Sequence, residues 1–297
     1  MPILGGHVSA AGGALKAIDR AVELGFATLQ IHPTSPQAWA KPAIPDDTAA
    51  AFTAGLQKNR LNSAFFHNIY LTNFASENQA GWHGSIEISK SYLQLSARMG
   101  VSGVITHLGS HKGAGLDAVL DRVVDGIKRM LAEAPADAYF LIENTAGAGG
   151  TIGRTLAEIE RITERIWPEY QNVGICIDSC HAFASGIPIH TAEGLESFLQ
   201  EFQTRFGLAA LRCLHLNDSK GDFASNKDRH ENIGDGSLGL EAFRHIVNHP
   251  KLQTVPMVME VPGIENKGPD RENLQRLQAL VTVASDPTIP FSATPRP

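Results

Sequence analysis

The sequence predicts a single α/β domain folded as a (β/α)8 TIM barrel, and three observations support this fold class. The chain has 297 residues, and about 250 is typical of such a barrel. Short apolar segments alternate eight times with longer segments of helical periodicity, which is typical of parallel sheets. The composition does not change along the chain, so we expect one domain over 1–284, followed by a loose, proline-rich tail over 285–297.

The expected strands are short apolar segments bounded by glycine, proline or polar residues. Two of them, Phe140-Leu141-Ile142 and Met257-Val258-Met259, are apolar on both faces, as expected for strands covered by helices. The eight predicted strands are 3–8, 27–31, 63–67, 103–107, 138–143, 173–178, 211–216 and 255–260.

The expected helices carry apolar residues at spacings of three and four. The clearest is 116–131, and in the first helix Leu15, Ile18 and Val22 have helical spacing. The predicted helices are 14–24, 46–58, 84–99, 116–131, 152–166, 191–206, 239–247 and 270–281. An open doubly wound sheet is the alternative fold, but no G-x-G-x-x-G follows the first strand.

Composition limits the class of protein. The net charge of −6 gives no overall basic field, so a polyanionic partner would need a local basic patch or bound metal. Three cysteines, an odd number, argue against a disulfide framework and for a reducing compartment. We identify neither a signal peptide nor a membrane span in the sequence. We therefore expect a cytoplasmic protein, associated with the nucleoid if the source is bacterial.

Side chains that bind metals recur at the ends of the predicted strands. The third to the eighth strand each end in His, Asp or Glu. In a barrel these ends converge on the face where active sites are built. Four carboxylates buried side by side would repel one another unless cations neutralised them. The candidate ligands are His67, His107, Glu143, Asp178, His181, His215, Asp228, His230 and Glu260.

Nine ligands exceed the four that one tetrahedral zinc ion takes, so two or three ions are expected. Imidazole and carboxylate together favour zinc, with manganese and iron as alternatives. Clustered divalent ions stabilise the attacking and leaving oxygens of a phosphoryl displacement. The residues alone therefore favour a metal-dependent hydrolase of a phosphate ester. A sugar isomerase on the same barrel type and a metal-stabilised DNA-binding or scaffold protein are the alternatives.

Five segments together resemble the endonuclease IV family of apurinic/apyrimidinic (AP) endonucleases, which are zinc-bearing DNA-repair barrels. The resemblance runs from about residue 3 to residue 281. It implies a zinc-dependent enzyme of base excision repair that cuts duplex DNA 5′ to an abasic site, leaving a 3′-hydroxyl and a 5′-deoxyribose phosphate. The segments are GHVSAAGG (6–13), HNIYLTN (67–73), ENTAG (143–147), IDSCHAFASG (177–186), and HLNDSK (215–220) with DRH (228–230).

The resemblance also implies a trinuclear zinc site, with manganese able to replace zinc at one position. His67, His107 and Glu143 would hold the first ion. Glu143 would bridge to a second ion, completed by Asp178, His215 and Glu260. His181, Asp228 and His230 would hold the third. Glu143, Asp178 and Glu260 are the expected catalytic residues, with Glu260 beside the reactive water, and the protein is expected to be a monomer.

The expected DNA contacts lie in the loops that follow the strands. The resemblance implies that Tyr70 and Leu71 enter the DNA at the abasic gap. The family commonly has Arg two residues before Trp39, where this chain has Gln37. This departure bears on DNA affinity and not on catalysis. Basic residues in these loops could form a local rim for DNA: Lys112, Lys220 and Arg229, together with Lys41 and Lys227.

Smaller departures from the family pattern leave the ligand set complete. Leu108 stands where the family usually has Pro, and Ser179 where it usually has Thr. Two further histidines, His7 and His111, are expected to lie beside the ligands and to orient them, without binding an ion.

Overall fold

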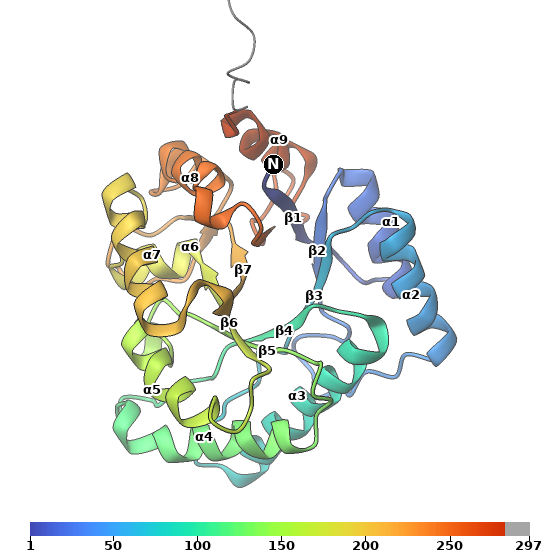
Figure 1. Cartoon of the computed structure of the whole chain (residues 1–297), viewed down its shortest axis with the longest axis vertical. Coiled ribbons are helices and arrows are strands. Elements are labelled where there is room, and N and C mark those ends of the chain that lie inside the picture. Colours follow the sequence, from blue (N-terminus) through green and yellow to red (C-terminus); the bar gives the residue numbers. More distant parts are fainter. Residues whose placement is uncertain (283–297) are drawn as a thin grey trace, which may run out of the picture.

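The computed structural model describes residues 1–282 and contains a closed barrel of eight parallel strands, in the order β1-β10-β7-β6-β5-β4-β3-β2. The (β/α)8 prediction is confirmed, and the open-sheet alternative is wrong. Figure 1 shows the strands around the centre with the helices outside them. The predicted tail over 285–297 lies outside the described residues. The barrel strands are β1 (Ile3–His7), β2 (Thr28–Ile31), β3 (Ser63–His67), β4 (Gly103–Thr106), β5 (Phe140–Glu143), β6 (Val173–Asp178), β7 (Leu211–His215) and β10 (Pro256–Met259).

The helices follow the strands and cover the outside of the barrel (Figure 1). Among residues 1–282, none of them is long and apolar enough to cross a membrane. The α-helices are α1 (Ala14–Leu24), α2 (Asp46–Lys58), α3 (Gln79–Met99), α4 (Leu116–Ala132), α5 (Leu156–Ile166), α6 (Ser179–Ser185), α7 (Ala192–Phe206), α8 (Gly239–Asn248) and α9 (Arg271–Leu280). Three short 3-10 helices are η1 (Ala148–Gly150), η2 (Leu208–Ala210) and η3 (Pro250–Leu252).

The helix boundaries differ from the prediction where a capping side chain decides them. The α3 helix starts before the predicted residue 84, because the Asn78 side chain accepts the Gly81 N–H at 3.1 Å. The α5 helix starts after the predicted residue 152, because Thr155 caps it through the Glu158 N–H at 3.2 Å. Side-chain caps therefore place both starts, which hydrophobic periodicity does not locate.

One α-helix and one small sheet that were not predicted lie within the metal-binding motifs. The α6 helix begins where the Asp178 carboxylate accepts the His181 N–H at 2.8 Å, and it ends at Gly186. Gly186 has φ of 98°, a conformation that glycine adopts without strain. A two-stranded antiparallel sheet of β8 (Asp218–Ser219) and β9 (His230–Glu231) returns the loop after β7 to the barrel. It carries His230 back toward the strand ends.

Only Ile18, of the three apolar residues noted in the first helix, lies on its buried face. Leu15 and Val22 are 40% and 45% exposed, whereas Ala17 and Ala21 are fully buried. Small alanines let the helix approach the barrel closely, so the large side chains on the adjacent face point to solvent.

A compact apolar layer lies inside the barrel directly beneath the candidate ligands. Side chains two apart on a strand point to the same side, and each member of this layer precedes a strand-end ligand by two residues. Its members are buried and form a hydrophobic cluster separate from the larger core between strands and helices. The layer therefore closes the barrel below the ligands. Its members are Phe65, Ile105, Leu141, Cys176, Cys213 and Val258.

Candidate metal centre

The nine predicted ligands come together at the C-terminal ends of the strands. The closest sets have donor atoms within 4.8 Å of one another. One set is His67, His107 and Glu143, another is Asp178, His181 and His230, and a third is Glu143, Asp178, His215 and Glu260. Asp228 joins them through Oδ1, which is 3.2 Å from His181 Nε2 and 3.4 Å from His230 Nε2.

Glu143 lies at the centre of the cluster and is fully buried. Its Oε2 atom is 3.2 Å from His67 Nε2 and also 3.2 Å from His107 Nε2. Its Oε1 atom is 3.0 Å from His215 Nδ1. Burial works to raise the pKa of Glu143, but His107 and His215 outweigh burial and hold that pKa well below the ordinary range. The carboxylate is therefore ionised and can serve two neighbouring positions.

The carboxylates and imidazoles shift one another's pKa values in opposite directions. Burial acts to lower the pKa of His181, but Asp178 and Asp228 overcome burial and raise that pKa to about 10. Burial also acts to lower the pKa of His215, but Glu260 and Glu143 overcome burial and raise that pKa well above its usual value. The carboxylates thus favour positive charge in the cluster, which divalent cations would supply in place of protons.

Hydrogen bonds orient three of the imidazoles through backbone carbonyls. His67 Nδ1 lies 2.9 Å from the Asn68 carbonyl oxygen, and His181 Nδ1 lies 3.0 Å from that of Asn144. His230 Nδ1 lies 3.3 Å from the Glu260 carbonyl oxygen. A carbonyl only accepts, so each Nδ1 carries a hydrogen, and in the neutral ring each Nε2 presents a lone pair to the cluster. This arrangement is typical of histidines that bind metals.

Gln30, on β2, orients the fourth imidazole and was not predicted. It is fully buried. Its amide nitrogen is 2.5 Å from Glu260 Oε1, which only accepts, so the amide oxygen must face His215 Nε2 at 2.8 Å. His215 Nδ1 is then left as the lone pair that faces the carboxylates. The same amide nitrogen lies 2.9 Å from His7 Nδ1, which places His7 beside the ligands.

The available signal for Gln30 was a polar residue one position before the end of a short predicted strand. Asn217, which the resemblance included in its motif, has a matching role on the other side of the cluster. It donates to Asp178 Oδ2 at 2.5 Å and accepts the Glu260 N–H at 2.7 Å. His111, in contrast, accepts the backbone N–H groups of a loop turn at Gly113 and Gly115.

The cluster fits divalent cations on its own geometry. His230 Nε2 is buried and has no hydrogen-bond partner among residues 1–282. It points to the region shared by Asp178 Oδ2, 3.7 Å away, and Asp228 Oδ1. A buried polar atom without a partner requires an explanation, and a bound ion is one that fits these surroundings. Together with the nitrogen and oxygen donors, this atom favours zinc or a similar transition metal.

A cavity of about 740 Å³ opens directly above the cluster. Its walls include His7, His32 and Tyr70, as well as the loop residues 266–269, and its floor includes candidate ligands. Glu260 lines this cavity, whereas Glu143 and Asp178 do not. Of the three carboxylates expected to be catalytic, Glu260 is therefore the one placed to meet a substrate.

The residues predicted to contact DNA are exposed on loops that follow the strands. Tyr70 is 63% exposed, and Leu71 and Gln37 are also exposed. The Tyr70 N–H donates to the Pro36 carbonyl oxygen at 2.9 Å, which ties the loop that carries Gln37 to the loop that carries Tyr70. Lys112, Lys220 and Arg229 are exposed as well. Their contact with DNA stays a prediction.

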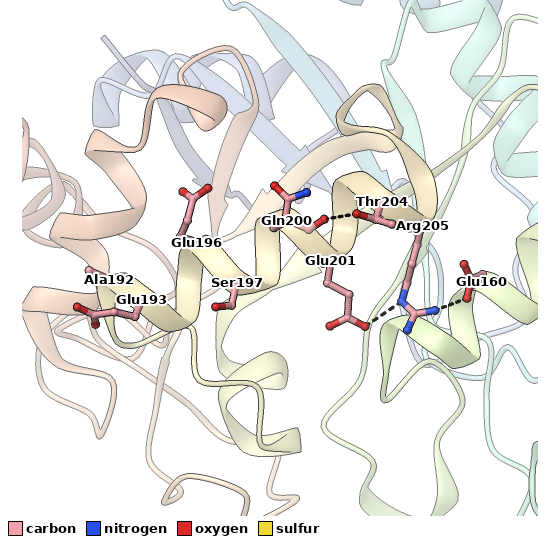
Figure 2. A pocket seen from close by; sticks show the side chains of 9 residues that line it. All are labelled: Glu160, Ala192, Glu193, Glu196, Ser197, Gln200, Glu201, Thr204 and Arg205. Atoms are coloured by element: carbon pink, nitrogen blue, oxygen red, sulfur yellow. Dashed lines mark hydrogen bonds and ion pairs between the residues drawn. The ribbon is translucent and has the colours of Figure 1, made fainter.

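A larger hollow, of about 1070 Å³, lies on the outer surface along α7 (Figure 2). Its charged side chains are largely engaged with one another or with neighbours. Arg205 bridges Glu160 and Glu201, and Glu196 pairs with Lys251. None of the candidate metal ligands lines this hollow. The cavity above the cluster is therefore the site of interest.

Comparison with known proteins agrees with the geometry. Residues 18–280 match the family model of the xylose isomerase-like TIM barrel. The fold and the site together define this class, with a histidine- and carboxylate-rich cluster at the strand ends. The structure of a D-tagatose 3-epimerase-like protein, 16% identical with a TM-score of 0.69, covers 93% of this chain and 95% of its own, and shares the fold alone.

The sequence relatives narrow the class. The chain is 37% identical to a probable endonuclease 4 of Methanoculleus marisnigri over 94% of this chain and 99% of that protein. It is 38% identical to a probable endonuclease 4 of Chloroflexus aurantiacus over 95% and 99%. The crystal structure of endonuclease IV from Thermus thermophilus matches with a TM-score of 0.81 and 29% identity, over 94% of this chain and 98% of that one. The chain belongs to the endonuclease IV family.

Proposed function

We propose that the protein is a zinc-dependent DNA-repair endonuclease of base excision repair. It hydrolyses the phosphodiester 5′ to an abasic site in duplex DNA, leaving a 3′-hydroxyl and a 5′-deoxyribose phosphate. The observation that carries this proposal is the convergence of nine imidazole and carboxylate side chains beneath an open cavity, in a member of the endonuclease IV family. A sugar isomerase would need fewer ligands.

The proposed cofactor is three zinc ions per chain, with Mn²⁺ able to occupy one position. The first ion takes His67, His107 and Glu143. The second shares Glu143 and takes Asp178, His215 and Glu260. The third takes His181, Asp228 and His230. When bound, such ions supply Lewis acidity toward the phosphate and hydroxide at neutral pH. The carbonyl-oriented imidazoles support this assignment, as does His230 Nε2, which has no hydrogen-bond partner within residues 1–282.

Glu260 is the proposed catalytic residue at the cavity floor, because its carboxylate is accessible while Gln30 fixes its position. Burial acts to raise its pKa, but His215 and His7 hold that pKa well below the ordinary range, so it is an acceptor at neutral pH. It would accept a hydrogen from the attacking water and orient that water toward phosphorus. Glu143 and Asp178 are fully buried, and their negative charges would balance the positive charge of the bound ions.

The rim is the proposed DNA-binding surface. Abasic DNA must bend and expose the lesion, at a cost of a few kcal/mol. Tyr70 and Leu71 would offset that cost by filling the gap in the base stack, and Gln37 lies on the loop joined to Tyr70. Lys112, Lys220 and Arg229 would contact phosphates, which need no base sequence.

We expect the protein to act as a monomer, because one chain provides the entire ligand set. Its substrate would place it in the cytoplasm, or at the nucleoid in a bacterium.

The test is incubation of the protein with a duplex that carries one abasic site, with an undamaged duplex as the control. We expect one cut at the lesion, a 3′ end that a polymerase can extend, loss of cleavage with chelator, and recovery with zinc. A 3′ end blocked by sugar would contradict the proposed reaction. Cleavage that is unaffected by thorough metal removal would contradict the proposed cofactor.

A further inference from the structure

His32 lies in the wall of the cavity but does not belong to the ligand set. It follows β2 directly and is held among three aromatic rings. Its ring centroid is 4.7 Å from that of His7, 5.2 Å from that of His67 and 5.3 Å from that of Tyr70. It therefore stands between a proposed metal ligand and a residue proposed to enter the DNA.

One hydrogen bond fixes the tautomer of His32. Its Nδ1 atom lies 2.9 Å from the carbonyl oxygen of His67. A carbonyl only accepts, so Nδ1 carries the hydrogen and Nε2 carries a lone pair. Nε2 has no hydrogen bond to any residue in the described part of the chain, and the side chain lines the cavity. This leaves Nε2 as the acceptor that His32 offers to a substrate.

His32 offers Nε2 as an acceptor in the neutral form of its ring. The ring packs against three aromatic rings and forms no ion pair with a carboxylate in the described part of the chain.

A neutral imidazole acceptor discriminates among the groups of damaged DNA. Its lone pair repels phosphate oxygens and attracts hydroxyl or amino hydrogens. An intact nucleotide carries its base at C1′, whereas an abasic deoxyribose carries a hydroxyl there. The sugar must turn toward the cavity for its 5′ phosphate to reach the cluster. The sugar would then lie beside the wall that contains His32.

We propose that His32 is a specificity-determining residue whose Nε2 accepts a hydrogen bond from the anomeric hydroxyl of the abasic deoxyribose. This inference rests on the proposed endonuclease function and names the part of the lesion that the site reads. The bond forms only with a sugar that has lost its base, so it adds recognition of the lesion to that provided by the gap in the stack.

The experiment compares kcat/KM for two duplexes that differ in this hydroxyl alone. One carries a natural abasic site and the other its tetrahydrofuran analogue, which has hydrogen at C1′. The variants are His32→Phe, which keeps a flat ring without an acceptor, and His32→Gln, which keeps an acceptor. We expect the unmodified protein to prefer the natural site by about 3- to 10-fold, the range for one hydrogen bond. His32→Phe should abolish the preference, and His32→Gln should retain part of it.

The ratio between the two substrates does not depend on the fraction of folded enzyme, so it decides the question even if a variant folds poorly. An equal preference in the unmodified protein and His32→Phe would overturn the inference. The inference would also be overturned if the effect of His32→Phe changed with the identity of the base opposite the lesion, because Nε2 would then contact an amino group. Failure of the unmodified protein to cut either duplex would instead refute the proposed function.

Discussion

Replacing Gln30 with methionine should weaken the second metal position more than the others. Methionine has a similar length and no amide, so three hydrogen bonds are lost, to His215 Nε2 at 2.8 Å, Glu260 Oε1 at 2.5 Å and His7 Nδ1 at 2.9 Å. A neutral bond contributes about 1 kcal/mol and a bond to a charged group about 1.5–3 kcal/mol. The three hydrogen bonds together therefore contribute about 3.5–5 kcal/mol to holding these side chains in place.

Part of this loss will fall on metal affinity, because His215 and Glu260 are both proposed ligands of the second position. Removing such supporting residues typically lowers metal affinity by about 10- to 100-fold. We expect the unmodified protein to contain close to three zinc ions per chain by elemental analysis. When both proteins are titrated with a chelator, Gln30→Met should release one ion at a chelator concentration about 10- to 100-fold lower than the unmodified protein.

Gln37→Met is the matched control, because Gln37 is an exposed glutamine on the loop after the same strand. It should retain all ions like the unmodified protein. The reasoning would be refuted if Gln30→Met kept every ion with unchanged affinity. It would also be refuted if the two variants lost metal equally. One ion or none in the unmodified protein would reject the trinuclear assignment itself.

Three further substitutions test other parts of the structure. Glu260→Gln should reduce turnover of abasic DNA by about 10²- to 10⁴-fold while DNA binding persists, and undiminished cleavage would reject its role. Gln37→Arg should tighten binding of abasic DNA, with the salt dependence of affinity steeper by about one unit if the new side chain reaches a phosphate. Isotherms on catalytically inactive protein at several salt concentrations would measure this, and unchanged affinity at every salt would mean that Gln37 does not face the DNA. Ala224 has φ of 57°, so Ala224→Gly should stabilise the protein by about 0.5–1 kcal/mol. Asn226→Gly, at φ of 53°, is its control and should gain less because Asn tolerates this conformation; equal shifts in Tm would contradict the strain argument.

The sequence by itself determined the order of strands and helices and the ends at which the candidate ligands lie. Hydrophobic periodicity is a local property, so it located α2, β3 and β6 at their observed bounds. The strand-end histidines and carboxylates could be placed on one face because parallel barrel strands all end there. The resemblance to a family then grouped these residues by ion, which their spacing alone could not do.

The tertiary structure alone decided how these residues are oriented. The periodicity of the first helix did not reveal that its alanines would face the barrel, because that depends on how closely the helix approaches its neighbours. The sequence did not reveal which residues Gln30 and His32 would contact. Gln30 reaches a histidine 185 positions away along the chain, and His32 is set by a carbonyl 35 positions away. Hydrogen bonds between such distant residues form only when the barrel closes, and they decide which ring nitrogen faces the cluster or the cavity.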